Sequence, residues 1–459
     1  MNRNNSLDAL RGFAILAMVL SGSIAFGPVL PAWMFHAQVP PPYHVYDPLL
    51  PGITWVDLVF PFFLFSMGAA FPLALHKKLQ QEPIHKTLLY IGQRYVLLVF
   101  FAIFTMHARA WVMSGQPTTV DHLISIGCFV LLFFMFVKFD KMNPQLALTL
   151  KLLAFALGVF FLWQYPFAKG FSITRSDVII IVLANMALFG ALIWMLTQKN
   201  PWLRIGILPF VMAIFLASKE KGSINQAIFD FTPAAWAYKF YYLKYLFIII
   251  PGTIAGDWML QRMKSTPAEE TQPSKGFYAT VALLGIGLNV LNTVCLFGRF
   301  LVFNLIATIV LLAILHWFLK KSNAAAYYKN LVAAGTYLLL LGLFFDAFEG
   351  GIKKDPSTYS YYFVTGGLAF FALLAFDAIG AISTKGFVHY LALNGKNPMV
   401  AYTAGNLVLI PLMKATDIFT YFTAIGSNAV GGFLQGVLFT GVVSAITVFF
   451  VLKKWYWKT

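Results

Sequence analysis

Apolar residues in this chain come in blocks of about 20, separated by short polar pieces. A block of that length is what an α-helix needs to cross roughly 30 Å of hydrocarbon. The blocks do not alternate apolar and polar positions as membrane β-strands do. The pattern therefore predicts an all-α polytopic membrane protein, a bundle of about 12 transmembrane helices with a range of 10 to 14. The blocks fall approximately at 7–28, 54–75, 87–108, 122–138, 145–163, 177–197, 203–217, 241–260, 277–297, 299–319, 329–348, 360–381, 388–412 and 432–452.

Some of these blocks are weaker candidates for spans than others. The blocks at 122–138 and 203–217 are short enough to be tilted, re-entrant or interfacial. The first block is expected to be a retained helix rather than a cleaved signal, because Asp8 and Arg11 interrupt the approach to its apolar run. The polar segments are too short for a core of their own, so we expect one transmembrane domain over 1–459 and no separate soluble domain.

Composition and charge agree with this class and give an orientation. The chain is 59% hydrophobic and only 11% charged, against roughly 25% charged in soluble proteins. Most of its net charge of +16 lies in the short loops, where Lys and Arg mark the cytoplasmic side, so nucleic acid is not an expected partner. Residues 29–53 hold no Lys or Arg, whereas 76–86 holds three lysines. The N-terminus and the segment 261–275 are therefore predicted to be cytoplasmic and the 29–53 loop extracytoplasmic.

Several kinds of chemistry have no support in the sequence. Cys128 and Cys295 lie alone in apolar blocks, so neither a disulfide framework nor a metal cluster is expected. A phosphate-binding glycine loop, a His-Glu-x-x-His pair and a Gly-x-Ser-x-Gly turn are absent from the sequence. The candidates that remain are ionisable residues gathered at helix ends.

An acid and an arginine, Asp8 and Arg11, lie at the start of the first block. Three positions apart on a helix, they share a face. An interfacial salt bridge and a part in a substrate site are both open interpretations. The same two interpretations apply in and just after the third block, to Arg94, His107 and Arg109. A charge inside an apolar run, such as Arg94, costs about a few kcal/mol unless it is partnered.

The loop after the first block carries two imidazoles, His36 and His44, beside the triproline 40–42. Proline fixes φ, so we expect this loop to be extended and its side chains to be held rigidly. An imidazole can take up and return a proton near neutral pH. Asp57, in the first turn of the second block, can cap that helix or orient an imidazole. A pair of ordinary surface histidines is the alternative.

Two later runs offer groups that can hold phosphates or a sugar. The segment 346–360 contains Lys353, Lys354 and Ser357 with glycine-freed backbone N–H groups. A solvated loop with a helix cap at Ser357 is the plain alternative. Asn397 precedes a proline-started helix, where an anion or a carbonyl oxygen can be bound.

Three motifs in order resemble a known family. They are Ser6-Leu7-Asp8-Ala9-Leu10-Arg11-Gly12, then Phe35-His36-Ala37, then the run 52–68 with Asp57-Leu58-Val59-Phe60-Pro61-Phe62-Phe63-Leu64-Phe65. With Lys354, Ser360 and Asn397-Pro398-Met399 farther on, the chain resembles the heparan-α-glucosaminide N-acetyltransferase family, and more closely the bacterial relatives labelled DUF5009. The resemblance is clear in the first 75 residues and patchy thereafter.

This resemblance implies an acetyl-CoA-dependent transmembrane acyltransferase in the bacterial inner membrane. It would move an acetyl group from cytoplasmic acetyl-CoA to an amino sugar or related glycan outside, by N-acetylation rather than O-acetylation, without a metal. The family's active histidine falls on His36, as general base or acyl carrier, and its acid on Asp57. Substrate or CoA contacts are expected from Asp8, Arg11, Ser21, His44, Lys353, Lys354, Ser357 and Asn397, with Asn397 or a helix N-terminus steadying the oxyanion. Ser21 stands where the family often has asparagine, and the loop after His36 is longer than usual.

A second class of function stays open at this point. A transporter or flippase of a sugar or other small polar solute would line a polar pathway with Arg94, Asp57 and Asp346. The sequence contains no internal repeat that supports the inverted-repeat type. A homo-oligomer is compatible with either class.

Overall fold

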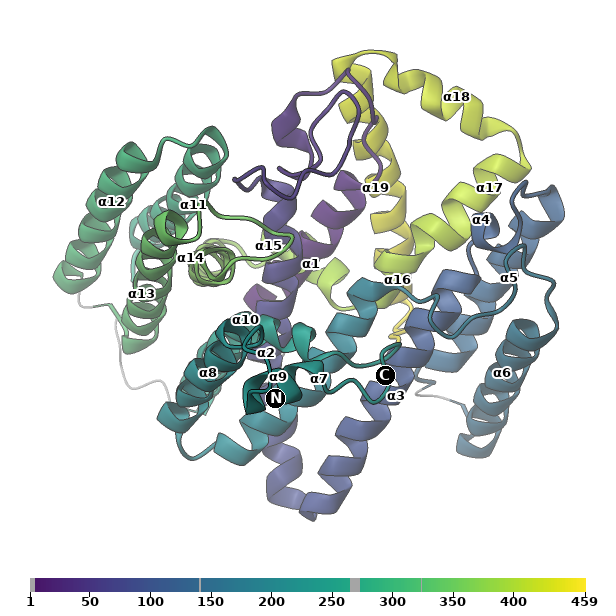
Figure 1. Ribbon diagram of the computed structural model, residues 1–459, viewed down its shortest axis with the longest axis horizontal. Coiled ribbons are helices and arrows are strands. Elements are labelled where there is room, and N and C mark those ends of the chain that lie inside the picture. The colour runs from purple at the N-terminus through teal and green to yellow at the C-terminus, as the bar shows by residue number, and fades with distance from the viewer. Residues whose placement is uncertain (1–4, 140–141, 265–272, 323) are drawn as a thin grey trace.

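The helices in the computed structural model follow the apolar blocks, and they form one bundle (Figure 1). The structure describes residues 5–139, 142–264, 273–322 and 324–459. Within these ranges, 11 helices are long and apolar enough to cross a membrane, and a bent pair (Pro398–Ala415 with Ile418–Ser427) makes up to 12. The predicted bundle of about 12 helices is confirmed.

In chain order, the α-helices are α1 (Asn5–Ser21), α2 (Trp55–Gln81), α3 (Ile84–His107), α4 (Ala110–Met113), α5 (Thr119–Phe136), α6 (Pro144–Gln164), α7 (Val178–Thr197), α8 (Pro201–Leu216), α9 (Ile224–Asp230), α10 (Leu246–Lys264), α11 (Lys275–Gly298), α12 (Leu301–Lys321), α13 (Ala326–Phe348), α14 (Tyr359–Ile382), α15 (Phe387–Gly395), α16 (Pro398–Ala404), α17 (Ile410–Ala415), α18 (Ile418–Ala424) and α19 (Ala429–Leu452).

Three predicted blocks had wrong limits, including 54–75, whose helix continues to Gln81. The first helix ends at Ser21 rather than near residue 28, because glycine and serine residues at 22 and 23 form a turn there. The block 388–412 is not one helix: α15 ends at Gly395, α16 starts at Pro398, and a π-helical turn (Gly405–Leu409) separates α16 from α17. A proline at the first helical position starts a new helix readily and cannot continue an old one.

The two short blocks differ from each other. The block at 122–138 becomes α5, which has 18 residues and qualifies as a span. The block at 203–217 becomes α8, which has only 16 residues. In the segment 261–275, α10 continues to Lys264 and α11 begins at Lys275, and residues 265–272 lie outside the described part of the chain.

The first two helices run antiparallel, which defines two ends of the bundle. Arg11 on α1 donates a hydrogen bond to the backbone oxygen of Ser66 on α2 (3.3 Å), and Phe13 packs near Phe62. We call the end where α1 begins the N face, and the end where α2 begins the His36 face.

Helices α1 and α15 cross at very close range. An added Cβ at Gly12 would lie 1.8 Å from the backbone oxygen of Leu391, and one at Gly395 would lie 1.8 Å from the backbone oxygen of Asp8. Only glycine, which has no Cβ, permits this approach. The crossing fixes the charged start of α1 against the broken helix region near residue 397.

Gly12→Ala should therefore destabilise the protein, because the new methyl group would meet backbone that cannot rotate away. Overpacking of this kind costs about 1–3 kcal/mol, and we expect a lower melting temperature in detergent. Gly92→Ala on α3 is the matched control, since nothing lies within 4 Å of its added Cβ. The control should be neutral or stabilising by about 0.5–1 kcal/mol. Equal melting temperatures for the two variants would contradict the close crossing.

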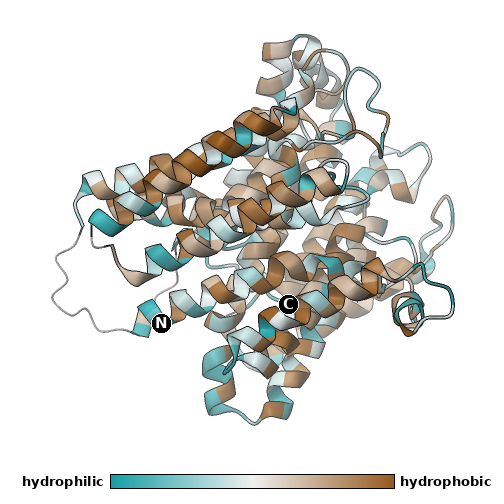
Figure 2. Cartoon of the chain, turned by 60° about the vertical axis from the view of Figure 1, so that its left-hand side comes forward, coloured by the Kyte–Doolittle hydropathy of each residue, from teal (hydrophilic) through white to brown (hydrophobic). Residues whose placement is uncertain are grey.

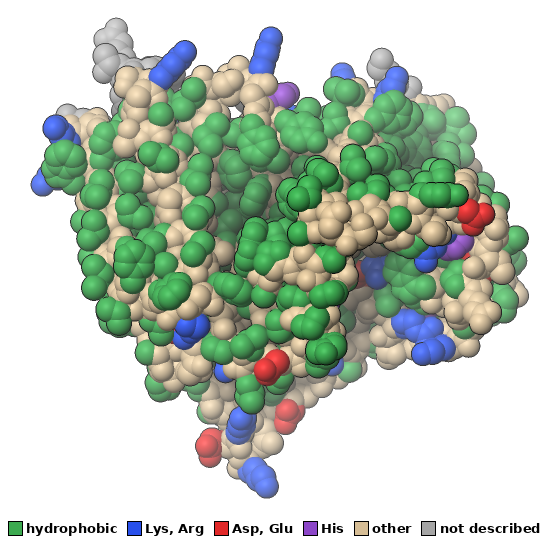
Figure 3. Space-filling view, turned by 90° about the horizontal axis from the view of Figure 1, so that it is seen from above, with side chains coloured by type: hydrophobic (Ala, Val, Ile, Leu, Met, Phe, Trp, Pro, Cys, Tyr) green, Lys and Arg blue, Asp and Glu red, His purple; other side chains and the backbone are tan. Residues whose placement is uncertain are grey.

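The surface of the bundle suits a lipid environment. Hydrophobic stretches fill the middle of many helices in Figure 2, and hydrophilic ones gather at helix ends and loops. Hydrophobic side chains cover much of the face in Figure 3, where charged side chains lie mostly toward the edges. Exposed apolar side chains of this extent are expected where lipid replaces water.

Candidate functional site

His36 and Asp57 form a close pair at the His36 face. The imidazole Nδ1 lies 2.7 Å from Asp57 Oδ1. The carboxylate is almost fully buried, with 2% of its side chain exposed, whereas 41% of the imidazole is exposed. A buried acid that holds one ring nitrogen leaves the other nitrogen available to a substrate, as in catalytic triads. The predicted contact between these two residues is confirmed.

The start of α2 explains why Asp57 is held in place. Thr54 and Asp57 form a capping box: the carboxylate accepts from the Thr54 N–H at 2.9 Å, and the Thr54 side chain accepts from the helix backbone. The second carboxylate oxygen also accepts from the Ala37 N–H at 3.2 Å, next to His36. Asp57 therefore caps the helix and orients the imidazole at the same time, so both interpretations of this residue hold.

Lys354 joins this pair from a distant part of the chain. Its Nζ lies 3.1 Å and 3.3 Å from the two ring nitrogens of His36, and 3.8 Å from Asp57 Oδ1. The ammonium thus lies against the imidazole ring, 318 positions away in sequence. Lys354 was expected to contact substrate or CoA, and the structure brings it to the catalytic candidates.

Two loops are tied together to make this contact. Gln38 exchanges hydrogen bonds with the backbone of Asp355, donating at 2.5 Å and accepting at 2.8 Å. The Gly52 N–H donates to the Ile352 oxygen at 2.7 Å. Because these bonds flank His36 on one side and Lys354 on the other, they set the distance between the two side chains.

An ion pair supports the Lys354 loop from beneath. Arg299 binds both carboxylate oxygens of Asp346, at 3.0 Å and 2.9 Å, and Asp346 also accepts from the Ile352 N–H at 2.6 Å. A bidentate guanidinium contact is strong and directional. Asp346 is thus engaged in holding the loop, and no signal in the sequence indicated that Arg299 would reach it.

The pKa of Lys354 lies below its ordinary value of 10.5, because burial disfavours the ammonium more than Asp57 and Asp355 favour it. Between the lowered pKa and 10.5 the unfolded chain binds more protons than the folded one, so folding stability rises with pH through that window. Lys354→Met removes this group. The melting temperature of the parent protein should therefore rise relative to that of the variant as the pH is raised toward 10.5. A difference that stays constant or falls would contradict the burial of this lysine.

The triproline loop is not extended, contrary to the prediction. The His44 N–H donates to the Pro40 oxygen at 3.0 Å and closes a turn, with His44 at φ 50°. Its Nε2 accepts from the Gly27 N–H at 2.9 Å, and its ring packs edge-on against Phe26 and Phe35. His44 therefore fixes the fold of the loop, and the structure does not bring it to His36.

The alternative of a solvated loop with a helix cap at Ser357 was wrong. The N-cap of α14 is Thr358, and the carboxylate of Glu349 accepts from the first two N–H groups of that helix, each at 2.7 Å. Ser357 is buried, with its hydroxyl 2.6 Å from Tyr362, so this loop is not solvated there. Lys353 contributes its backbone, which exchanges hydrogen bonds with Thr358.

The residues predicted on α1 lie along its length rather than at one site. Asp8 and Arg11 form the expected ion pair at 3.2 Å near the N face. Ser21 lies at the other end, where its hydroxyl donates to the backbone oxygen of Met18 at 2.9 Å. The structure therefore separates Ser21 from the Asp8 pair by the length of the helix.

A cavity of about 390 Å³ lies between α1, α2, α3, α7 and α16. On α2 its lining extends from Val59 to Ala74, roughly 22 Å of helix at 1.5 Å per residue. Most of the wall is apolar. His36 is not among the lining residues, whereas Val59 and Phe60, two and three positions after Asp57, are. We call this cavity the inner chamber.

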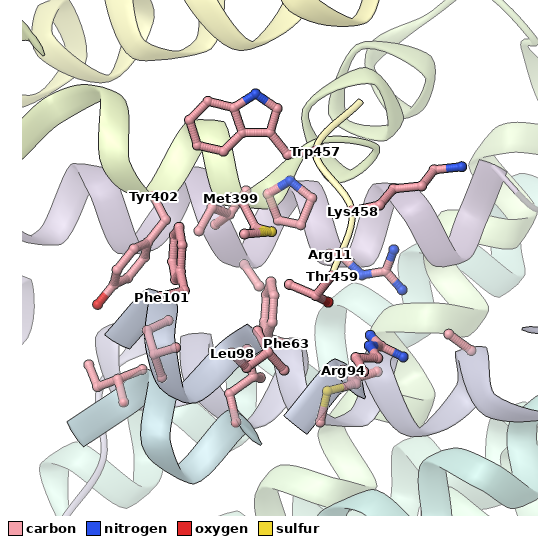
Figure 4. Close-up of a pocket in the computed structure, with 18 of the residues that line it drawn as sticks. Arg11, Phe63, Arg94, Leu98, Phe101, Met399, Tyr402, Trp457, Lys458 and Thr459 are labelled. Carbon is pink, nitrogen blue, oxygen red and sulfur yellow. The ribbon is translucent and has the colours of Figure 1, made fainter. Parts of the chain in front are cut away.

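Cations gather at the N-face end of the inner chamber. Figure 4 shows Arg11, Arg94 and Lys458 at one end and Tyr402 at the other, and Lys396 also lines the chamber. Among the residues that the structure describes, no carboxylate lies within ion-pair distance of Arg94, although Arg11 has Asp8. An unpaired guanidinium at the wall of a cavity favours an anionic ligand.

Asn397 lies at this same end and not at His36, so its predicted oxyanion contact was wrong. Its side chain donates to the Trp455 oxygen at 2.8 Å and accepts from the Trp457 N–H at 3.1 Å. Both polar atoms of the amide are therefore occupied by the C-terminal segment (455–459), four residues of which line the inner chamber.

The pathway predicted for a transporter is not assembled from the expected residues. Arg94 lines the inner chamber, but Asp57 and Asp346 do not. Asp57 belongs to the His36 group and Asp346 to the ion pair with Arg299. His107 is buried, and its Nδ1 lies 2.9 Å from the backbone oxygen of Ile103.

Comparison with known protein families gives a match. A family model described as "Domain of unknown function (DUF5009)" matches residues 3–259, which is more than half of the chain. The matched part contains His36, Asp57 and Arg94. No curated protein matches this sequence.

Proposed function

The chain belongs to the family described as Domain of unknown function (DUF5009), and on that premise and the geometry of the site we propose that it is a membrane-embedded acyltransferase. It moves an acetyl group from cytoplasmic acetyl-CoA to an amino sugar or related glycan on the other side of a bacterial cytoplasmic membrane. The N face is cytoplasmic, and the His36 face is extracytoplasmic.

One observation supports this proposal most strongly. His36 and Asp57 lie at one face of the bundle, and the inner chamber extends from near Asp57 toward the N face, where cationic side chains line it. His36 Nδ1 is 2.7 Å from Asp57, and α2, which begins at that acid, lines the chamber along most of its length. A donor with phosphates at one end and a reactive group at the other suits this arrangement. Its phosphates would meet Arg11, Arg94, Lys396 and Lys458.

The reaction uses Nε2 of His36, the ring nitrogen that does not face Asp57. With the proton on Nδ1 directed at Asp57, Nε2 carries the lone pair and takes a proton from the acceptor amine as that nitrogen attacks the thioester carbonyl. A C–N bond forms and the C–S bond breaks. The proton then passes from the imidazole to the CoA thiolate, and Asp57 stabilises the imidazolium in between.

Lys354 supplies the positive charge that an oxyanion needs. Its Nζ is 3.3 Å from His36 Nε2, so an acceptor nitrogen beside that ring atom also brings the attacked carbonyl near the ammonium. Groups fixed where charge develops are usually the largest contribution to catalysis. We assign to Lys354 the role first expected of Asn397.

A relay through an acetyl-imidazole is the variant in which His36 is the nucleophile. Its Nε2 would attack the thioester first, releasing CoA, and the acceptor amine would then take the acetyl group. Rapid mixing of enzyme with acetyl-CoA alone separates the two. A burst of free CoA equal to the enzyme concentration supports the relay, and no burst supports direct transfer.

The proposal is tested with purified protein in liposomes, with acetyl-CoA on one side and a panel of amino sugars on the other. Acceptor-dependent release of CoA thiol, with acetylated sugar detected by mass spectrometry, is the expected result. Uptake of labelled sugar without any CoA release would overturn it in favour of a transporter. The same liposomes carrying a His36→Ala variant give the background for both measurements.

A further inference from the structure

A second cavity, of about 420 Å³, lies beyond the inner chamber toward the His36 face. Its polar wall includes Arg109, Asp177 and Asn406. We call it the outer chamber. Three residues line both chambers, namely Met18, Ile179 and Tyr402. The chambers are therefore stacked end to end, and these three side chains form the junction between them.

Tyr402 is the part of this junction that is held by a polar contact. Its hydroxyl donates to Asp177 Oδ2 at 2.6 Å, and Arg109 binds the same oxygen at 2.6 Å. Asp177 and Arg109 are largely buried, with 7% and 16% of their side chains exposed. A hydrogen bond to a charged group in such surroundings is stronger than one in water. The aromatic ring is thus fixed across the junction from one side.

The helix that carries Tyr402 is irregular on both sides of this residue. Tyr402 lies near the end of the short helix α16, and the next turn, Gly405–Leu409, is π-helical. Such turns are rare and are frequent at functional positions in helices. Before α16 the chain is already broken between Gly395 and Pro398. Tyr402 is therefore carried by a helix that runs from Pro398 to Ala415, with a π-helical turn that begins three residues after it.

We propose that Tyr402 is a gate, and that its displacement joins the two chambers into one path across the bundle. The path runs from the cationic mouth at Arg94 to Asn406 in the outer chamber. This inference goes beyond the acyl-transfer function, because it concerns a path whose opening is measured without any reaction.

The test is the accessibility of one thiol from the two faces. In a background of Cys128→Ala and Cys295→Ala, Leu183→Cys gives a thiol on the wall of the inner chamber only. A membrane-impermeant cationic methanethiosulfonate is added to sealed vesicles at one face at a time. We expect fast labelling from the N face and slow labelling from the His36 face.

Opening the gate should change only the rate at which Leu183→Cys is labelled from the His36 face. With Tyr402→Ala added, labelling from the His36 face should rise at least tenfold, and with Tyr402→Phe, which keeps the ring but loses the Asp177 bond, it should rise less. Tyr90→Ala is the control, because Tyr90 lies at the N-face end of the inner chamber. In this variant, labelling from the His36 face should stay slow. Asn406→Cys should react from the His36 face whichever residue occupies position 402.

Two results would overturn the gate. One is labelling of Leu183→Cys from the His36 face at the same rate with tyrosine, phenylalanine or alanine at 402. The other is an equal acceleration by Tyr90→Ala. If Tyr402→Ala does not give a monodisperse protein in detergent, the comparison of Tyr402→Phe with the parent decides. Loss of acetyl transfer in any variant has no bearing on these rates, so this test and that of the enzyme are independent.

Discussion

His36→Ala should lower the rate of acetyl transfer by about 10²- to 10⁴-fold, the range that a positioned general base contributes. The variant should keep its expression level and melting temperature, because 41% of the imidazole is exposed and it supports no helix. The measurement is steady-state CoA release with acetyl-CoA and an acceptor sugar, beside a thermal unfolding curve. In the relay mechanism the loss would be as large, because the acyl carrier itself is removed.

His44→Asn is the matched control for a second imidazole in the same loop. Asparagine tolerates the left-handed backbone of this position, which has φ 50°, so the exchange removes the ring without backbone strain. Activity should remain within about threefold of the parent value, as expected for a residue that binds loop backbone. Equal losses from the two variants would mean that the two rings act together, and full activity in His36→Ala would end the proposed mechanism.

Arg94→Leu should raise the KM for acetyl-CoA by about 10- to 100-fold with little change in kcat. A hydrogen bond between charged groups contributes about 1.5–3 kcal/mol, and each 1.4 kcal/mol is a factor of ten in affinity. The effect falls on KM because Arg94 lies at the end of the inner chamber remote from Asp57. CoA titrations at saturating acceptor measure both constants.

Stability gives a second readout of the same residue. Without ligand, the leucine variant should melt at a higher temperature than the parent, since an unpaired charge in an apolar wall is removed. With acetyl-CoA, the parent should gain stability by binding and the variant much less. Lys86→Ala, on the exposed first turn of α3, is the control that should leave both properties unchanged. An unchanged KM in Arg94→Leu would exclude Arg94 from the donor site.

The helices could be predicted from sequence because lipid sets one length for all of them. Errors came where a local residue overrode the apolar pattern: α1 stops at Ser21 before a glycine, and the block from 388 is cut before Pro398. Hydropathy alone does not register such breaks, since the residues on either side remain apolar.

The pair of His36 and Asp57 could be predicted because the capping signal of α2 and the loop before it are local. Lys354 was found as part of a polar run, but its contact with the imidazole depends on two loops meeting across 318 positions. A single sequence carries no distance between such loops. The same limit applies to Arg299, whose ion pair with Asp346 holds the second loop.

Asn397 and Tyr402 mark two other limits of sequence reasoning. An asparagine before a proline-started helix suggests an anion site, yet its amide is occupied by the backbone of the C-terminal segment. Tyr402 lies in an apolar block, where an aromatic residue is ordinarily core. Its place at the junction of two cavities follows only from the packing of α16 against α7 and α1.

The site is built from two loops that are far apart in the sequence, so its parts are synthesised at different times. As a polytopic chain enters the bilayer from its N-terminus, His36 and Asp57 can meet as soon as α2 begins, with a separation of 21 positions. The lysine arrives only after α13 has been synthesised, 318 positions behind the histidine. A nascent or prematurely terminated product therefore carries the imidazole and its acid without the cation, and the assembled group exists only once the loop after α13 has left the ribosome.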